Sequence, residues 1–287
     1  MVLLAEKLVL SLKFLYKSDK NHLKKHSKSL DEFLSKISNF LNQPLFKPGT
    51  VGSKSLSLEW FQNYFDLINL ADKAFAELVI EIEYPMSQWG GKATDEYLNY
   101  SLSFLENLNI ISSSLSHINQ AKVSISQALI LVEKDSQAAA AKSLRKIQGI
   151  RNLNINPGRG FKVEGCSSSG IKKRHGSDKK EGTILEAVMV LKKIGSLALG
   201  IVLAGFDDPV KKNLEIRGPV EEVNRGVERL CEGKCDEGVL RELKGRLVVL
   251  GNCVQGVEKR VNDMFSQVLA ARSMLLDNIR LLICEQV

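Results

Sequence analysis

The sequence has few residues that interrupt helices and few with aromatic rings. Only 6 of its 287 residues are proline, and aromatic residues make up 6%. Because proline ends or kinks a helix, its scarcity permits long helices. The 5 cysteines have no framework spacing, which argues against a disulfide scaffold and is typical of reduced thiols inside a cell. With 44% hydrophobic residues, the chain is long enough to bury a sizeable core.

The chain also lacks an uninterrupted apolar run of membrane-spanning length. Residues 187–206, AVMVLKKIGSLALGIVLAGF, are almost entirely apolar, but Lys192 and Lys193 split them. The thirteen uncharged residues between Lys193 and Asp207 would form a helix of about 20 Å, whereas a bilayer core needs about 30 Å. We therefore predict an inner helix of a bundle, with a membrane-inserted helix as the alternative.

Three segments carry a sustained apolar repeat with helical spacing. The first runs from about Leu56 to Ile82 and the second from Thr94 to about Val132. The third is the most regular, with apolar residues that alternate steps of four and three: Leu243, Leu247, Leu250, Val254, Val257, Val261, Met264, Val268, Ala271 and Leu275. Such a repeat is the seam of a long helix that packs along its neighbours. We predict an all-α protein: a long antiparallel helical bundle with coiled-coil-like packing.

Three further patterns indicate where helices begin. Ser29 with Glu32, and Thr183 with Glu186, have the spacing of a capping box. Pro219 suits the first turn of a helix that runs to about Cys231.

The positive charge of the chain lies in one segment. Residues 145–180 contain ten Lys or Arg and two acids, so they carry +8, although the whole chain carries only +7. Much of this segment is rich in Gly and Ser and is too polar to form a core of its own. We predict an N-terminal helical half (1–150), a flexible basic loop (151–182) and a C-terminal helical half of the same bundle (183–287).

The basic loop supplies the candidate binding residues. Its lysines and arginine have the chemistry to contact an acidic partner or anionic lipid: Lys172, Lys173, Arg174, Lys179 and Lys180. A plain solvated linker remains the alternative. Four serines are candidates for phosphorylation, which would reduce this charge: Ser167, Ser168, Ser169 and Ser177. Aromatic residues do not alternate with the basic ones, so we expect no nucleic-acid partner.

No set of residues has the spacing of a catalytic or metal site. His22 and His26 are four apart, but lysines surround them and no acidic ligand is near. Cys231, Cys235 and Cys253 lack a fourth zinc ligand. His117 has no nucleophile or carboxylate to act with. We therefore predict a protein that is not an enzyme and binds no metal or cofactor.

Several motifs resemble the plant BYPASS family. They are YPMSQW at residues 84–89, DEYLNYSLSFL at 95–105, VLAARSMLL at 268–276 and the opening MVLLAEKL. The resemblance implies a regulator of plant development. Such a regulator restrains a mobile signal that comes from the root and that would otherwise arrest shoot growth. The resemblance also implies protein partners, among them an exocyst subunit, and it assigns no catalytic residue.

The functional alternatives follow from these observations. The first is a non-catalytic regulator or adaptor that binds proteins through helix surfaces. The second is a membrane-anchored component of exocyst-linked secretion that uses the helix at 187–206. The third, an enzyme of carotenoid-derived signal metabolism, has no reactive centre in the sequence. The N-terminus lacks the Ser- and Arg-rich, acid-free character of a transit peptide, so we predict a cytoplasmic location, in contact with endomembranes such as the endoplasmic reticulum, rather than a plastid one.

Overall fold

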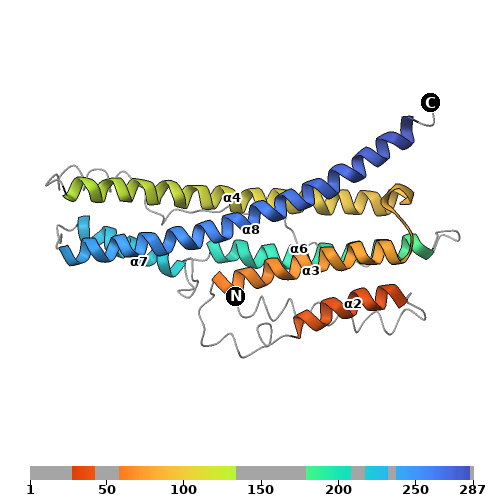
Figure 1. The fold of residues 1–287 in the computed structure, drawn as a ribbon, viewed down its shortest axis with the longest axis horizontal. Helices are drawn as coiled ribbons and strands as arrows, with labels where there is room; N and C mark the ends of the chain where they lie inside the picture. Colours follow the sequence, from red (N-terminus) through yellow and green to blue (C-terminus); the bar gives the residue numbers. More distant parts are fainter. Residues whose placement is uncertain (1–27, 43–57, 134–178, 208–216, 232–236, 285–287) are drawn as a thin grey trace.

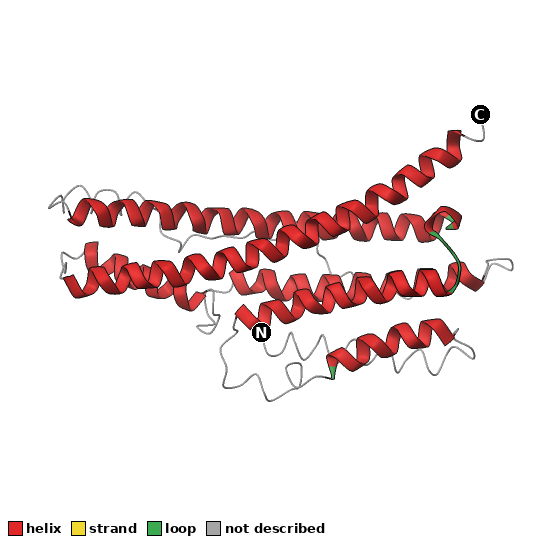
Figure 2. Ribbon diagram, viewed as in Figure 1, coloured by secondary structure: helices red, strands yellow, loops and turns green. Residues whose placement is uncertain are grey.

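A computed structural model describes residues 28–42, 58–133, 179–207, 217–231 and 237–284 of the chain. Throughout these ranges the chain is helical except at short turns, and they contain no strand (Figure 2). The elements are α2 (Lys28–Leu41), α3 (Leu58–Glu81), the 3₁₀-helix η2 (Met86–Gln88), α4 (Gly91–Glu133), α6 (Lys179–Asp207), α7 (Arg217–Cys231) and α8 (Glu237–Cys284). The predicted all-α class is confirmed.

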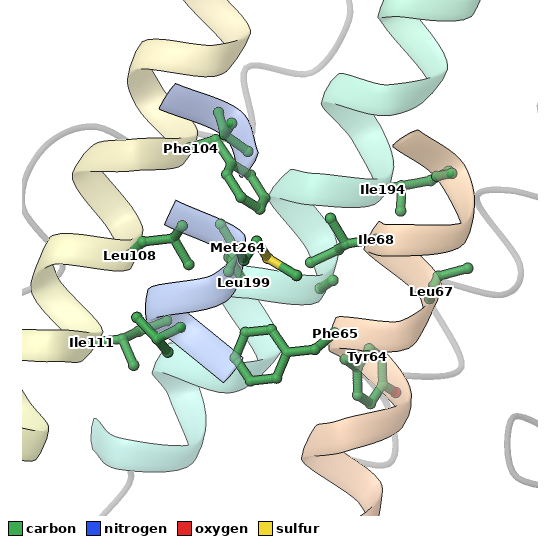
Figure 3. Packing of buried hydrophobic residues seen from close by; sticks show 14 of the residues in the cluster. Tyr64, Phe65, Leu67, Ile68, Phe104, Leu108, Ile111, Ile194, Leu199 and Met264 are labelled. Atoms are coloured by element: carbon green, nitrogen blue, oxygen red, sulfur yellow. The ribbon is translucent and has the colours of Figure 1, made fainter. Parts of the chain in front are cut away.

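Four helices, α3, α4, α6 and α8, surround a common core (Figure 1). Figure 3 shows side chains of all four meeting there: Phe65 and Ile68 from α3, Phe104 and Leu108 from α4, Leu199 from α6 and Met264 from α8. Each of these is at most 2% exposed. At about 25 cal/mol for each Å² removed from water, apolar burial of this kind is the main force that holds the helices together.

The four core helices run in two directions. Contacts of Glu96 with Lys192, and of Tyr100 with Gly195, make α4 and α6 parallel neighbours. Contacts of Ser101 with Arg272, and of Glu133 with Lys244, make α4 and α8 antiparallel. With 43 residues, α4 is about 65 Å long. Glu133, the last residue of α4, and Lys179, the first residue of α6, are therefore separated by about the length of α4.

The predicted seams are confirmed where the structure describes their side chains, except that Ile82 and Ala271 are only partly buried. On α3 the buried members are Phe65, Ile68, Ala71, Phe75 and Leu78, and on α4 they are Tyr97, Phe104, Leu108, Ile111, Leu115, Ile118, Ile125, Leu129 and Val132. On α8 nine members of the four-three repeat are buried: Leu243, Leu247, Leu250, Val254, Val257, Val261, Met264, Val268 and Leu275. Ala271 is only partly buried, although Leu275, four residues further along α8, is fully buried.

The stretch split by lysines lies in α6. Its apolar side chains up to Leu199 include seven buried core residues: Ala187, Val188, Val190, Leu191, Ile194, Ala198 and Leu199. Lys192 points outward and pairs with Glu96 of α4, with 3.3 Å between Nζ and Oε2. Among the helices that the structure describes, none is both long and apolar enough to cross a bilayer.

Two shorter helices lie against the four-helix core. α2 buries Leu30, Phe33, Ile37 and Leu41 and contacts mainly α3, where Lys36 Nζ lies 2.7 Å from Glu77 Oε2. α7 pairs with the start of α8 in an antiparallel hairpin, with Gly226 beneath the Leu243 side chain. The prediction for α7 is confirmed, since it runs from Arg217 to Cys231 with Pro219 in its first turn.

The predicted capping box at Thr183 lies inside a helix, whereas the one at Ser29 lies within one residue of a helix start. α6 begins at Lys179, and Thr183 already lies inside the helix, where its hydroxyl donates to the Lys179 carbonyl oxygen over 3.0 Å. α2 begins at Lys28, one residue before Ser29. The spacing S/T-x-x-E also occurs within a first helical turn, where the hydroxyl bonds backwards instead of capping. The domain division at 150 and 182 stays a prediction, although α6 begins within the range assigned to the loop.

Candidate functional site at the α3–α4 turn

Two of the predicted basic contact residues lie at the start of α6. Lys179 and Lys180 occupy its first turn and are exposed. Lys180 Nζ donates to the backbone carbonyl oxygen of Glu83 over 3.3 Å, which brings this lysine to the turn between α3 and α4. The other predicted residues lie outside the described part of the chain: Lys172, Lys173, Arg174, Ser167, Ser168, Ser169 and Ser177.

The turn between α3 and α4 is held by its own hydrogen bonds. Glu83 ends α3 with a positive φ of 50°, and the next residue, Tyr84, donates its backbone N–H to the Val79 carbonyl oxygen over 3.3 Å. The buried Trp89 indole Nε1 donates to the Tyr84 carbonyl oxygen over 3.0 Å. Pro85 then precedes the 3₁₀-helix η2, which contacts α8. The turn is therefore a fixed structure against which other side chains can be placed.

A row of aromatic rings extends from this turn into the core. Phe75 of α3 contacts Trp89 and Tyr97, with ring centroids 5.9 and 6.0 Å apart. The row continues along α4 through Tyr100 to Phe104, with centroid separations of 6.3 and 5.8 Å. Edge-on and tilted ring pairs of this kind contribute roughly 1 kcal/mol each beyond their buried area.

α8 reaches the same region through Arg272. Its Nη1 donates to Ser101 Oγ of α4 over 2.8 Å and also to the Leu98 carbonyl oxygen. Ser101 is fully buried, and its hydroxyl in turn donates to the Leu98 carbonyl oxygen over 3.0 Å. The guanidinium therefore donates to two neighbouring oxygen atoms of α4 within the α4–α8 contact.

Three ionisable groups beside this contact have perturbed pKa values. Burial raises the pKa of Asp72, a partly buried carboxyl on α3, from 3.8 to about 7. Burial, and then the Asp72 charge, raise the pKa of Tyr97 to about 12, while Arg272 acts in the opposite direction. Burial, then the Asp72 charge and Tyr97, hold the pKa of Tyr100 well above its usual value. The Asp72 carboxyl therefore titrates at a higher pH than an ordinary aspartate, while both phenols stay neutral at pH 7.

This arrangement can bind and release a proton near neutral pH. A carboxyl with a pKa of about 7, near enough to Tyr97 and Tyr100 to raise the pKa of both phenols, combines one titrating group with fixed donors. Perturbed carboxyls also occur in purely structural networks, so the pKa does not by itself mark a catalytic centre. The described residues contain no cluster of His, Cys, Asp and Glu that could hold a metal ion.

This polar group was not predicted from the sequence, although the sequence contains a signal for it. Asp72 follows Ile68 by four residues and precedes Phe75 by three, so it lies on the apolar face of α3. A carboxylate on such a face is rarely buried without a cause. Arg272 likewise lies at the edge of the C-terminal seam, four residues after Val268 and three before Leu275.

The rejected candidates lie elsewhere. His117 is exposed on α4, in agreement with a surface histidine. Cys253 is partly buried on α8, while Cys235, His22 and His26 lie outside the described residues.

Comparison with known proteins gives two plant relatives. The chain is 23% identical over 277 residues to "Protein BPS1, chloroplastic" of Arabidopsis thaliana, which covers 79% of this chain and 78% of that protein. It is 28% identical over 124 residues to "UPF0496 protein 4" of Oryza sativa, in subspecies indica and japonica, which covers 42% of this chain and 27% of that protein. The resemblance to the BYPASS family is confirmed. No family model matches the chain, and no solved structure matches it.

The three internal BYPASS motifs meet at the site described above. YPMSQW forms the turn with Trp89, and DEYLNYSLSFL supplies Tyr97, Tyr100 and Ser101 at the start of α4. VLAARSMLL supplies Arg272 from α8, although it lies more than 160 residues further along the chain. These three motifs therefore form one region in space, at the end of the bundle where α3 joins α4.

Proposed function

We propose that this chain is a non-catalytic regulator of plant development that acts as an adaptor and restrains a root-derived mobile signal, which arrests shoot growth. The observation that carries the proposal is the similarity to BPS1 over most of both chains. The convergence of the three BYPASS motifs at one end of the bundle supports it, because it gives the relationship a common structural centre.

The packing of the bundle supports an adaptor in particular. Apolar side chains from four helices fill its interior, with Phe104, Leu108 and Leu199 fully buried (Figure 3). A protein whose inner faces are satisfied by one another meets its partners through the outer faces of its helices. We propose that the partner is a protein, with an exocyst subunit as the candidate that the family resemblance implies.

The basic start of α6 is the proposed contact for an acidic partner or an anionic membrane surface. Lys179 and Lys180 are exposed there, next to the turn formed by the BYPASS motif. In the sequence, four residues separate them from Lys172, Lys173 and Arg174, so the five charges belong to one segment of nine residues. Each basic residue near an anionic surface contributes about 1 kcal/mol.

Reciprocal grafting tests the developmental role. Roots that lack the protein, grafted beneath normal shoots, should arrest the growth of those shoots, while the reverse graft should grow normally. Complementing the roots with the wild-type chain should restore growth. Normal shoots above roots that lack the protein would contradict the proposed function.

A matched pair of charge reversals tests the contact surface. The double variant Lys179→Glu and Lys180→Glu should fail to restore shoot growth, and it should lose partner or vesicle binding in sedimentation assays. Lys259→Glu, a charge reversal at another exposed lysine, on α8, should behave as wild type. Equal complementation by both variants would remove the basic segment from the mechanism.

We further propose a cytoplasmic location in contact with endomembranes. The word "chloroplastic" belongs to the name of BPS1, so plastid residence is the competing result. A fluorescent fusion at the C-terminus, followed by carbonate extraction of membranes, should give cytoplasmic signal and an extractable protein. Signal inside plastids would refute the proposed location without affecting the adaptor role.

A further inference from the structure

Two neighbouring side chains at the start of α6 contact the two ends of the α3–α4 turn. Lys180 Nζ donates to the backbone carbonyl oxygen of Glu83, where the turn begins. The carboxylate of the next residue, Glu181, lies against Gly90, where the turn ends, since a Cβ added to Gly90 would be 2.6 Å from Glu181 Cδ. In Figure 1 the green start of α6 lies at the same end of the bundle as this turn. The two contacts therefore enclose the motif YPMSQW at residues 84–89.

The charges of these two side chains match the helix ends that they contact. The C-terminal end of a helix carries partial negative charge on its carbonyl oxygens, and the N-terminal end carries partial positive charge on its N–H groups. The carbonyl oxygen of Gly90 accepts from the N–H of Thr94 over 3.2 Å, so Gly90 directly precedes the first turn of α4. The Lys180 ammonium thus lies near the negative end of α3, and the Glu181 carboxylate lies at the positive end of α4. We call this pair of contacts the α6 latch.

The lysine half of the α6 latch is a contact that an anion can replace. The 3.3 Å between Lys180 Nζ and the Glu83 oxygen is slightly longer than an ordinary N–H···O hydrogen bond, and this acceptor is neutral. An anionic oxygen binds an ammonium more strongly than a neutral carbonyl does. Lys179 and Lys180 are both exposed, so a large anionic surface can reach them. Lysine is a compact point charge that suits the diffuse charge of a phospholipid surface, whereas paired recognition of a protein carboxylate favours arginine.

We propose that the α6 latch is closed in the free protein and opens when the start of α6 binds an anionic membrane surface. This inference rests on the proposed contact of Lys179 and Lys180 with such a surface, and it adds the regulation of that contact. At the membrane the Lys180 ammonium exchanges the Glu83 oxygen for lipid phosphate, and the negative surface repels Glu181 beside it. The closed latch therefore lowers the affinity for the membrane, because part of the binding energy is used to open it.

The first test asks whether the α6 latch exists, with a pair of glycine variants that change no charge. In Gly90→Ala the new methyl group displaces the Glu181 carboxylate, whereas a Cβ at Gly91 has no atom of the described chain within 4 Å. Hydrogen exchange of the full-length chain is followed by mass spectrometry without lipid. Exchange at residues 181–187 and 84–90 should become at least about threefold faster in Gly90→Ala, and Gly91→Ala should match wild type. Equal exchange in the two variants would overturn the proposal.

The second test asks whether a membrane opens the α6 latch. Vesicles of phosphatidylcholine with phosphatidylserine should accelerate exchange in the same two segments of the wild-type chain, and vesicles of phosphatidylcholine alone should not. Gly90→Ala should bind the anionic vesicles about two- to fivefold more tightly than wild type, since its latch is already open. Glu181→Gln keeps the size of the side chain but removes the repelled charge, so it should also bind more tightly. Gly91→Ala should bind as wild type does.

The outcomes separate the latch from the proposed membrane contact. A wild-type chain that does not bind the anionic vesicles would remove the contact, and the opening with it. Binding that leaves exchange in both segments unchanged, or equal affinities of Gly90→Ala, Glu181→Gln and wild type, would overturn the latch alone. Faster exchange with polyglutamate but not with vesicles would assign the opening to an acidic protein and overturn the membrane as its cause. Circular dichroism of every variant confirms that its helices are intact.

Discussion

Gly195 of α6 lies directly against the Tyr100 ring of α4. A Cβ added to Gly195 would lie 3.0 Å from Tyr100 Cε2 and 3.2 Å from Phe104 Cδ2, closer than side chains normally approach. The absence of a side chain at this position is therefore what allows α6 to pack against the aromatic row. Through this contact, α6, the helix that contains the apolar run at 187–206, packs against the site formed by the BYPASS motifs.

Replacing this glycine should destabilise the bundle. Gly195→Ala should lower the free energy of unfolding by about 1–2 kcal/mol, because the overpacking of two buried rings exceeds the gain in helix propensity. Urea unfolding followed by circular dichroism measures the change. Gly200→Ala on the same helix is the control: a Cβ there has no atom within 4 Å, so stability should rise by up to about 1 kcal/mol. Equal effects of the two variants would contradict the close contact.

Stability should depend on pH through Asp72. Burial raises the pKa of Asp72 from 3.8 to about 7 in the folded chain, so the unfolded chain loses this proton at lower pH. Ionisation therefore favours unfolding as the pH rises from about 4 to about 7, and the loss is complete above that range. Asp72→Asn, which resembles the neutral acid, should raise the free energy of unfolding by about 2–4 kcal/mol at pH 8 and by almost nothing below pH 4.

Asp66→Asn, six residues earlier on α3, is the control for this prediction. Asp66 Oδ1 lies 2.5 Å from Arg260 Nη1, and both side chains are more than one third exposed. Loss of such an exposed ion pair should lower stability by at most about 1 kcal/mol. Urea unfolding of both variants at several pH values separates the two carboxyls. A pH-independent gain for Asp72→Asn would show that its carboxyl is not the titrating group.

The link between Arg272 and Ser101 should be measurable as a coupling energy. Arg272→Met keeps most of the apolar length but removes the donors to Ser101 Oγ and to the Leu98 carbonyl oxygen. We expect a loss of about 1–3 kcal/mol, since a charged donor to buried oxygens is lost. In a double-mutant cycle with Ser101→Ala, the coupling energy should be about 1 kcal/mol. Strictly additive losses would mean that the two side chains do not act together.

The long helices were predictable because their seams repeat over many turns. The α8 repeat from Leu243 to Leu275 gives ten chances to detect one period, and nine of those side chains are buried. The starts of the helices were harder to predict, because a capping box depends on four residues only. At Thr183 the same four residues lie inside α6, and the hydroxyl bonds backwards to Lys179.

The site was less predictable than the fold because its residues are far apart in the sequence. Asp72, Tyr97 and Arg272 lie on three helices, and only the pairing of these helices brings the residues together. The apolar repeats show that α3, α4 and α8 each have a buried face, but they do not show which faces meet or in what register. For the basic segment the sequence was more informative than the structure. Its charge is evident in the sequence, but only Lys179 and Lys180 of its candidate residues lie in the described part of the chain.

A glycine at position 83, directly after α3, should stabilise the folded chain. Glu83 donates its N–H to the Ile80 carbonyl oxygen over 3.0 Å, and Tyr84 donates to that of Val79, which is the hydrogen-bond pattern of a Schellman motif. Its central residue, Glu83, has a φ of 50°, a left-handed conformation that costs a residue with a side chain about 1–2 kcal/mol. Glu83→Gly should therefore raise the free energy of unfolding by up to about 1 kcal/mol, after the greater entropy of the unfolded glycine is included.

Glu83→Val provides the opposite change at the same position. A β-branched side chain is strained further in the left-handed region, so this variant should be about 1 kcal/mol less stable than wild type. Urea unfolding at pH 7 ranks the three chains, and the contact from Lys180 should survive in all of them because it uses the Glu83 backbone oxygen. A valine variant as stable as the glycine one would mean that residue 83 is not held in the left-handed conformation, and the turn that positions Trp89 would then need another explanation.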